Sequence, residues 1–331
     1  MNLQQVAKRA GVSTATVSRV LNNQELVRDK TRDRVIKAID ELKYHPNVHA
    51  RSLAGGKSRT IGVILSNFEN PFFFDIYKAV ETDARARGYE VVVANTGYRA
   101  DLLSVCIRSM LGRRVAGLAL IVSESSPEIL DELQGASMPI VLYDAGKTAG
   151  NLLSIRVNYR RGIEKVVDYL FGMGHRKFGF VGHHGSLSPL SDRKDALVHA
   201  AARLGKGIEV QVAADADTLE GGRFAARQLL ATGYQPTAMV CANDLMAVGV
   251  LREMRERGLR VPQDISVTGF DNIKLSEFCY PALTTAHVPR EHIGHVVCRG
   301  LIPRGDEQPI GHDVLIDPEL VVRESTGPAP R

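Results

Sequence analysis

From Thr60 onward, short apolar runs alternate with amphipathic helical patterns, and this alternation restricts the fold more than any other feature of the chain. Strand-like runs occupy residues 61–65, 91–94, 118–122, 140–143, 178–181, 210–213, 238–241 and 265–269. Strands that alternate with helices form parallel sheets with helices on both faces. We therefore predict an α/β fold with two lobes of doubly wound parallel sheet that meet near residue 158.

The C-terminal part contains strand-like segments at 286–289, 314–316 and 320–322, with a helical pattern near 290–301. These elements are too few for a domain, so we expect them to complete the two sheets and to make the core a hinged clamshell. The expected core spans residues 60–331, with a first lobe of about 60–157 and 288–312 and a second lobe of about 158–287 and 313–331. Ligands of such sheets bind at the carboxyl ends of the strands, here in the cleft between the lobes.

Residues 3–22 have a different pattern, with apolar side chains at helical spacing on both sides of Gly11. Gly11 can end a first helix in the left-handed conformation, and Ser13 can cap a second helix over residues 14–22. Together with a third helix at 31–42, this predicts a helix-turn-helix headpiece over residues 1–45. Its expected core is formed by Val6, Val17, Val20, Val35 and Ile39.

Basic charge is concentrated at the N-terminal end of the chain. Residues 1–60 hold 12 Lys and Arg against 5 Asp and Glu, whereas the remaining 271 residues hold 30 against 32. A basic helix-turn-helix module is typical of DNA binding, because neutralised phosphates release counterions. Residues 46–59 follow, and Pro46 with Gly55 and Gly56 indicates a short hinge helix and linker.

Other classes of protein are disfavoured by what the sequence does not contain. There is no apolar run of membrane-spanning length and no signal-peptide pattern, so we expect a cytoplasmic protein without membrane contact. The four cysteines are scattered, and the pairs His183 with His184 and His292 with His295 lack further ligands, so no metal site is expected. Dinucleotide, Walker A and hydrolase motifs do not occur, so we expect no enzyme, no catalytic residue and no cofactor. A periplasmic sugar-binding protein would share the clamshell but would need a signal peptide.

The chain resembles the LacI/GalR family of bacterial transcription regulators over nearly its whole length. The shared motifs are Val6-Ala-x-x-Ala-Gly-Val-Ser13, Thr16-Val-Ser-Arg-Val-Leu-Asn22, Tyr44-His-Pro-Asn47, Ala50-Arg-Ser-Leu-Ala54, Asn70-Pro-Phe-Phe73, Gly174-His-Arg176, Asn243-Asp-x-Met-Ala-x-Gly249, Val261-Pro-Gln-Asp264, Gly269-Phe-Asp-Asn272, Pro281-x-Leu-Thr-Thr285 and Pro318-x-Leu-Val-Val-Arg-Glu-Ser325. The resemblance implies a regulator, most simply a repressor, that binds a near-palindromic operator as a homodimer. Since no leucine heptads occur near the C-terminus, we expect a dimer and not a coiled-coil tetramer.

The same resemblance implies how the headpiece and hinge would meet DNA. Thr14 and Ala15 match the positions that mainly set operator preference, and Leu53 matches the leucine that wedges into the minor groove. Arg19 could contact guanine or phosphate. Arg28 stands where the family has a serine cap, so Asp29 is expected to cap the third helix. The complete expected DNA-binding set is Ser13, Thr14, Ala15, Thr16, Arg19, Asn22, Arg51, Leu53 and Lys57.

A small effector is expected in the cleft. Asp144, Asn243 and Asp271 each follow a predicted strand, so their side chains should converge at strand carboxyl ends. By resemblance, Arg193 adds a bidentate donor and Phe72 and Phe73 add flat apolar walls, which suits a sugar or sugar derivative. Asn70, from the same motif as the two phenylalanines, completes the expected effector-binding set. The purine-responsive relatives differ at the positions of Leu187, Pro189 and Ala216, so purines are disfavoured. The residues leave open whether the effector releases or tightens DNA binding, and whether a protein partner replaces it at a vestigial cleft.

Overall fold

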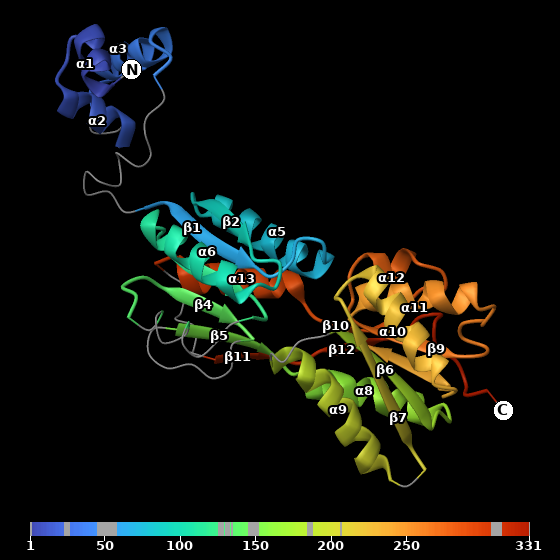
Figure 1. The fold of residues 1–331 in the computed structure, drawn as a ribbon. Helices are drawn as coiled ribbons and strands as arrows, with labels where there is room; N and C mark the ends of the chain where they lie inside the picture. Colours follow the sequence, from blue (N-terminus) through green and yellow to red (C-terminus); the bar gives the residue numbers. More distant parts are fainter. Residues whose placement is uncertain are drawn as a thin grey trace. The chain divides into compact units, whose positions relative to one another are not determined.

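The computed structural model describes residues 2–22, 27–44, 58–124, 129, 133, 135–144, 152–183, 188–205, 207–305 and 313–330. The chain divides into two compact units, Met1–Ser58 and Arg59–Arg331, which we call the headpiece and the core (Figure 1). The hinge expected at residues 46–59 lies almost entirely outside the described residues, as do the side chains of Arg51, Leu53 and Lys57.

The headpiece consists of α1 (Leu3–Ala10), α2 (Thr14–Asn22) and α3 (Asp29–Glu41). Gly11 ends α1 with a φ of 66°, in the left-handed region that glycine adopts without steric cost. The helices enclose a small core in which Ala7, Ala10 and Ala38 join four valines, Val6, Val17, Val20 and Val35. Ile39 is only partly buried against this core.

Two cap predictions have different outcomes. Ser13 Oγ accepts a hydrogen bond from the Thr16 backbone N–H at 3.2 Å, so the predicted cap of α2 is confirmed. The expectation that Asp29 caps α3 is wrong, because Asp29 is already the first helical residue and Arg28 precedes it without a side-chain cap. Asp29 instead forms an ion pair with Arg32 one turn later, at 2.9 Å.

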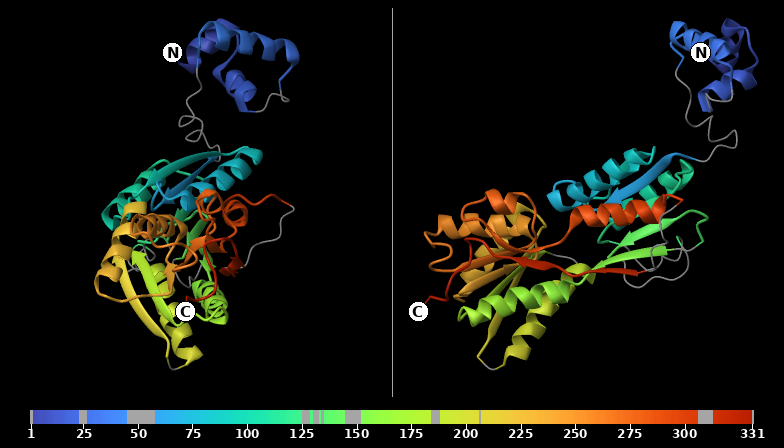
Figure 2. Two further views of the ribbon diagram at one scale, coloured as in Figure 1. Left: turned by 90° about the vertical axis from the view of Figure 1, so that its right-hand side faces the viewer. Right: turned by 180° about the vertical axis from the view of Figure 1, so that it is seen from behind.

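The first lobe of the core contains a six-stranded parallel sheet with the order β11-β5-β4-β3-β1-β2. Its strands are β1 (Thr60–Leu65), β2 (Glu90–Asn95), β3 (Leu118–Ile121), β4 (Ile140–Tyr143), β5 (Leu152–Val157) and β11 (Asp313–Ile316). Helices α5 (Pro71–Ala86) and α13 (Arg290–Leu301) cover one face, and α6 (Ala100–Gly112) covers the other (Figure 2). Alternate residues of β1 enter the two apolar layers: Val63 packs under α5 and α13, and Ile64 packs under α6.

The second lobe repeats this plan with the strand order β12-β10-β9-β8-β6-β7. Its strands are β6 (Lys177–His183), β7 (Glu209–Asp215), β8 (Ala238–Cys241), β9 (Ser266–Asp271), β10 (Thr284–His287) and β12 (Glu319–Val321). Helices α8 (Tyr159–Gly172) and α9 (Ser188–Leu204) pack together on one face, and α10 (Leu219–Ala231) and α11 (Asp244–Glu256) pack together on the other. The short helix α12 (Leu275–Phe278) follows β9. The predicted fold class is therefore confirmed.

The structure differs from the expected chain path in three places. Strand β5 was not predicted, because Ser154 and Arg156 interrupt its apolar run. The edge strand β12 is antiparallel to β10, whereas all other pairs are parallel. Residues from 313 were expected in the second lobe, but β11 pairs with β5 in the first lobe, so the chain enters the second lobe only after Ile316.

The chain passes between the lobes at three places, after β5, after β10 and after β11. Within the described residues, no helix is both long enough and apolar enough to span a membrane.

Candidate functional site

Helix α2 has one buried face and one exposed face. Val17 and Val20 point into the headpiece core, whereas Thr14, Ala15 and Arg19 are exposed. Ser13 is exposed at the start of the helix and Thr16 is partly buried. An exposed N-terminal end with short side chains allows the backbone to approach base edges closely. Asn22 ends α2, but its side chain lies outside the described residues.

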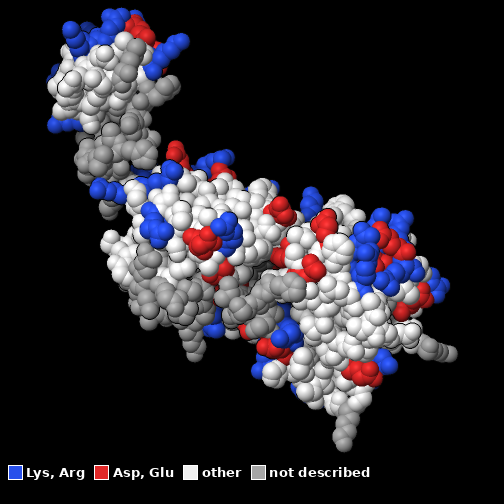
Figure 3. All heavy atoms as spheres, in the orientation of Figure 1, with Lys and Arg blue, Asp and Glu red and all other residues white. Residues whose placement is uncertain are grey.

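Lys and Arg outnumber Asp and Glu on the visible face of the headpiece (Figure 3). Some of this charge is paired internally, since Arg9 forms an ion pair with Glu41 and Arg32 forms one with Asp29. Arg19 is exposed on α2, one turn beyond Ala15. Arg19 is therefore an exposed positive charge on the same helix as Thr14 and Ala15, as a contact with a phosphate backbone requires.

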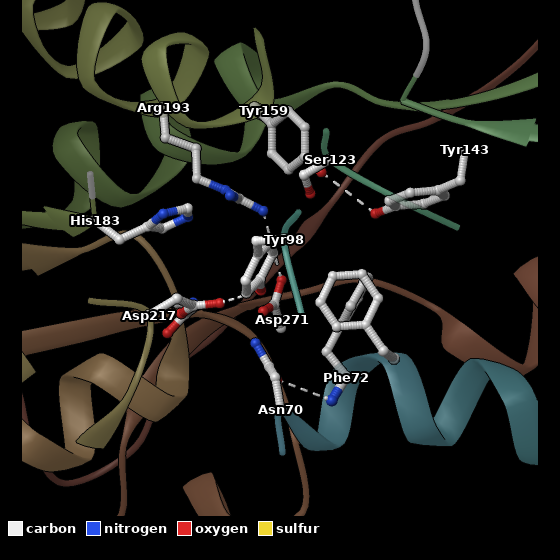
Figure 4. A pocket seen from close by; sticks show the side chains of 12 residues that line it. Asn70, Phe72, Tyr98, Ser123, Tyr143, Tyr159, His183, Arg193, Asp217 and Asp271 are labelled. Carbon is white, nitrogen blue, oxygen red and sulfur yellow. Dashed lines mark hydrogen bonds and ion pairs between the residues drawn. The ribbon is translucent and has the colours of Figure 1, made fainter. Parts of the chain in front are cut away.

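The core encloses a cavity between the lobes, at the carboxyl ends of both sheets (Figure 4). Its volume of about 30 Å³ has room for about two water molecules. First-lobe residues on its wall are Asn70, Phe72, Phe73, Tyr98, Ser123 and Tyr143, and second-lobe residues are Tyr159, His183, Arg193, Asp217, Asn243 and Asp271. A ligand larger than water can therefore enter only if the lobes or these side chains move apart.

Arg193 and Asp271 form the charged pair of this cavity. Arg193 Nη2 lies 3.9 Å from Asp271 Oδ1, which is too long for a hydrogen bond. Both side chains are buried, and neither Arg193 Nε nor Asp271 Oδ1 has a hydrogen-bond partner among the described residues. The guanidinium stacks over the Tyr159 ring, 4.0 Å from its centroid. The pair therefore presents an unused donor and an unused acceptor to the cavity, which is the arrangement expected of a ligand site.

Asp271 is held in a strained position. Its φ of 103° lies in a region that non-glycine residues rarely adopt. Arg290, at the start of α13, donates to the backbone oxygen of Asp271 and to that of Asn272. Burial raises the pKa of the Asp271 carboxyl well above its usual range, and the Arg193 charge opposes this shift. Strain of this kind is found at functional sites, where surrounding contacts impose it.

Aromatic side chains form the opposite wall. Phe72 and Phe73 lie in the first turn of α5, which Asn70 caps by accepting a hydrogen bond from the Phe72 backbone N–H at 3.0 Å. The two phenylalanine rings meet edge to face, with centroids 5.4 Å apart, and Phe72 also contacts Tyr143. The cap directs both rings into the cavity because it fixes the first turn of the helix.

Asn243 lines the cavity, whereas Asp144 does not. Asn243 lies on the wall, caps α11 by accepting from the Met246 N–H, and donates to Asp217 at 2.5 Å. Asp144 is not on the wall, contrary to our expectation, because its carboxyl accepts from the Tyr159 hydroxyl and from the Val157 N–H. Burial raises the pKa of Asp144 to about 6. Asp144 therefore joins the lobes behind Tyr159.

The sequence prediction did not include six residues of this wall, Tyr98, Ser123, Tyr143, Tyr159, His183 and Asp217. Tyr143 and His183 are the last residues of β4 and β6, and Ser123 and Asp217 lie two residues beyond β3 and β7. The strand-end rule would have found these four if it had been applied to every predicted strand. Tyr159 has no such signal, because it belongs to the first turn of α8 at a crossing between the lobes.

Asp244 supports the loop after β9, and its burial makes stability depend on pH. It accepts from the Ile273 N–H at 2.8 Å and from the Thr285 hydroxyl, and burial raises its pKa to about 7. The folded protein therefore holds a proton that the unfolded chain releases near pH 4, so this residue's contribution to stability falls as the pH rises from 4 to 7. The Asp244→Asn variant has no titrating group at this position, so we expect its unfolding free energy to lack this contribution. The contribution of Asp244 falls by up to roughly 4 kcal/mol between pH 4 and 7.

Urea unfolding of Asp244→Asn and of the parent protein at pH 4.5 and 7.5 measures this difference, and the contributions of other carboxyls cancel in the comparison. If the difference in unfolding free energy between variant and parent is the same at both pH values, Asp244 does not titrate in this range.

A basic helix-turn-helix unit joined to two lobes around a charged and aromatic cavity defines a class of protein, the ligand-controlled DNA-binding regulators. Residues 2–47 match the model described as "Bacterial regulatory proteins, lacI family", and residues 167–326 match the periplasmic binding protein-like domain. The HTH-type transcriptional repressor PurR of Erwinia tasmaniensis is 34% identical over 99% of this chain and 97% of its own length.

Solved structures agree with this match. A lac repressor dimer bound to operator and to the anti-inducer ONPF has 29% identity and a TM-score of 0.85, with 99% of both chains covered. The transcriptional regulator CelR in complex with cellobiose has 27% identity and a TM-score of 0.70 over 98% of this chain and 99% of its own. The chain belongs to the LacI family, and it is a DNA-binding transcriptional repressor with a small-molecule effector. The relatives that this chain matches are transcriptional repressors, which are not enzymes.

Proposed function

We propose that the effector of this repressor is a hydroxyl-rich small molecule, a sugar or sugar derivative, which binds in the interlobe cavity. The observation that supports this most directly is the pair of unused buried polar atoms, Arg193 Nε and Asp271 Oδ1. Buried polar groups are usually paired, so a ligand that offers both a donor and an acceptor satisfies them. A hydroxyl group does both.

The aromatic wall supports the same assignment. Phe72 and Phe73 present apolar surface opposite the charged pair, and the CH face of a pyranose or furanose can pack on such rings. The CelR structure contains a disaccharide, cellobiose, and CelR is similar to this chain. Aromatic rings can also stack a purine base, so purines are the main competitor that the experiment has to test.

We further propose that the repressor binds a near-palindromic operator as a homodimer in the cytoplasm, with Ser13, Thr14, Ala15, Thr16 and Arg19 at the bases and phosphates. The solved lac repressor is a dimer on its operator. The second lobe also has apolar side chains that suit a subunit contact, since Phe278 is 70% and Tyr280 is 90% exposed. Residues Asn22, Arg51, Leu53 and Lys57 complete the proposed DNA-binding set by resemblance.

One experiment tests this proposal. A thermal-shift screen of neutral sugars, sugar acids, sugar phosphates, purines and nucleosides should give a rise in Tm of several degrees with at least one neutral sugar, because a ligand at about 100 times its Kd stabilises by about 2.7 kcal/mol. The affinity for an operator selected from random DNA should then change when that sugar is added, and the operator footprint should show two half-sites. A shift with purines only, or with no compound of the panel, would contradict the sugar assignment.

A further inference from the structure

Two pairs of cavity-lining side chains form hydrogen bonds between the lobes, Tyr143 with Tyr159 at 3.3 Å and Tyr98 with Asp217. The Tyr98 hydroxyl, beyond the end of β2 in the first lobe, donates to Asp217 Oδ2, which precedes α10 in the second lobe, at 2.5 Å (Figure 4). The other oxygen of Asp217 accepts from Asn243 Nδ2 at 2.5 Å. Both side chains line the cavity, so this contact lies where a ligand would bind.

Tyr98 is fixed from the first lobe. Its backbone N–H donates to the Ser66 carbonyl at 3.2 Å, and its ring contacts Phe73 with centroids 6.4 Å apart. The preceding Thr96 is buried and donates to the buried Glu124 carboxylate, which also accepts from the Ser66 hydroxyl at 2.6 Å. These contacts place the ring before any ligand is present. Burial and the neighbouring Asp217 raise the pKa of Tyr98 well above its usual range, so its hydroxyl remains a donor.

Asp217 is equally well placed from the second lobe. It is 8% exposed and lies immediately before Thr218, which caps α10 by accepting from the Gly221 N–H at 2.9 Å. Asn243, its other partner, is fixed as the cap of α11. A carboxylate that two rigid helices hold in this way cannot follow Tyr98 when the lobes separate, so opening of the cavity has to break the hydrogen bond.

We propose that Tyr98 and Asp217 form a latch that holds the lobes together without ligand, and that the effector opens it by offering its own donor to Asp217 in place of the Tyr98 hydroxyl. This inference rests on the proposed function, which assigns the effector to this cavity. The volume of about 30 Å³ supports it, because a sugar cannot enter while the latch is closed.

The latch also restricts the chemistry of the effector. Asp217 and Asp271 line the cavity together with one guanidinium, that of Arg193, and Asp144 and Glu124 lie directly behind the wall. A phosphate or carboxylate placed against Asp217 could not replace the Tyr98 donor, and it would face the neighbouring carboxyls. The effector is therefore a neutral or amino-bearing molecule with a hydroxyl or amino group directed at Asp217, and sugar phosphates and sugar acids are excluded.

Hydrogen exchange of the full-length protein without ligand tests the latch. The Phe72 and Met246 amides donate to cap residues on opposite walls of the cavity, so their exchange reports its opening. In Tyr98→Phe, we expect exchange in both segments to rise about tenfold, because a hydrogen bond to a charged acceptor is lost. The matched control is Tyr234→Phe, which removes a hydroxyl that donates to the carbonyls of Phe178 and Glu209 within the second lobe.

The pair itself is tested by a double-mutant cycle. Asp217→Ala alone should raise exchange at least as much as Tyr98→Phe, and the double variant should add nothing further, since both remove the same contact. Unchanged exchange in Tyr98→Phe, the same rise in Tyr234→Phe, or additive effects in the double variant would overturn the latch. These readouts need no ligand, so they are decisive even if the sugar panel gives no shift.

The restriction on ligand chemistry has its own readout. In the thermal-shift panel, glucose should be compared with glucose 6-phosphate and gluconate, and ribose with ribose 5-phosphate. Shifts confined to the neutral member of a pair support donation to Asp217. A larger shift with a phosphorylated or acidic member would overturn this part of the inference, while leaving a sugar effector in place.

Discussion

An Asp271→Ala variant should bind the effector at least about 100-fold more weakly than the parent protein and still bind operator DNA. The carboxyl is 3% exposed and has an unused oxygen beside the Arg193 guanidinium. In the proposed complex, Asp271 accepts a hydrogen bond from the ligand, and truncating one partner of a buried charged hydrogen bond costs roughly 2–5 kcal/mol of binding free energy. Titration calorimetry with the sugar that gives the largest thermal shift measures the loss, and anisotropy with labelled operator measures DNA binding.

Two further variants make this result specific. Asp271→Asn removes the charge but keeps the shape of the side chain and suits the positive φ at this position. A loss of effector affinity in this variant therefore does not arise from a folding defect. Asp264→Ala is the matched control, because Asp264 pairs with the exposed Arg260 at 2.7 Å in the same lobe. Equal effector affinity in Asp271→Ala and Asp264→Ala would show that the effector does not bind at Asp271.

Gly249→Ala should destabilise the core by several kcal/mol, roughly 3 or more. Gly249 lies in α11 where this helix approaches α10, and a Cβ there would stand 1.9 Å from the backbone oxygen of Leu219. A backbone atom cannot move aside as a flexible side chain can, so the helices must separate. Gly222 on α10 has the reciprocal role, with a Cβ that would stand 2.1 Å from the Met246 oxygen.

The control for this prediction is Gly112→Ala, at the last position of α6, where a Cβ would meet nothing within 4 Å. Urea unfolding should show a change of less than about 1 kcal/mol, since glycine in a helix is slightly unfavourable. If Gly249→Ala and Gly112→Ala unfold at the same urea concentration, α10 and α11 are not packed closely at Gly249.

The fold could be predicted because its strongest signals are local. Gly11 and Ser13 determine the ends of two helices by backbone conformation and capping, and buried parallel strands are continuous apolar runs. Strand β5 and the position of β11 could not be predicted in this way. Their place depends on pairing between segments far apart in the sequence, Ser154 with Asp313 for example, and no local pattern records such pairing.

The candidate site was predictable only in part. The strand-end rule predicted Asn243 and Asp271 on the cavity wall because each follows a strongly apolar strand. The same rule wrongly placed Asp144 there, because the sequence does not reveal that the Asp144 carboxyl accepts hydrogen bonds from Tyr159 and Val157. The contact between Tyr98 and Asp217 joins residues 119 positions apart. It depends on how the two lobes meet, and the sequence has no periodic signal for that arrangement.

Strand β1 gives the core a direct connection between its two ends. Thr60 at its start follows the linker from the headpiece, and Leu65 at its end leads through Ser66 to Asn70 and Phe72 at the cavity. The six residues of β1 span about 20 Å and are paired on both sides, with β2 and β3, so the strand cannot stretch or bend alone. A ligand at the proposed site that shifts Asn70 and Phe72 would therefore move β1 together with β2 and β3, and with them the start of the core at Thr60. An effector at the proposed site would therefore act at one end of β1, whereas the DNA-binding unit precedes the other end of this strand in the chain.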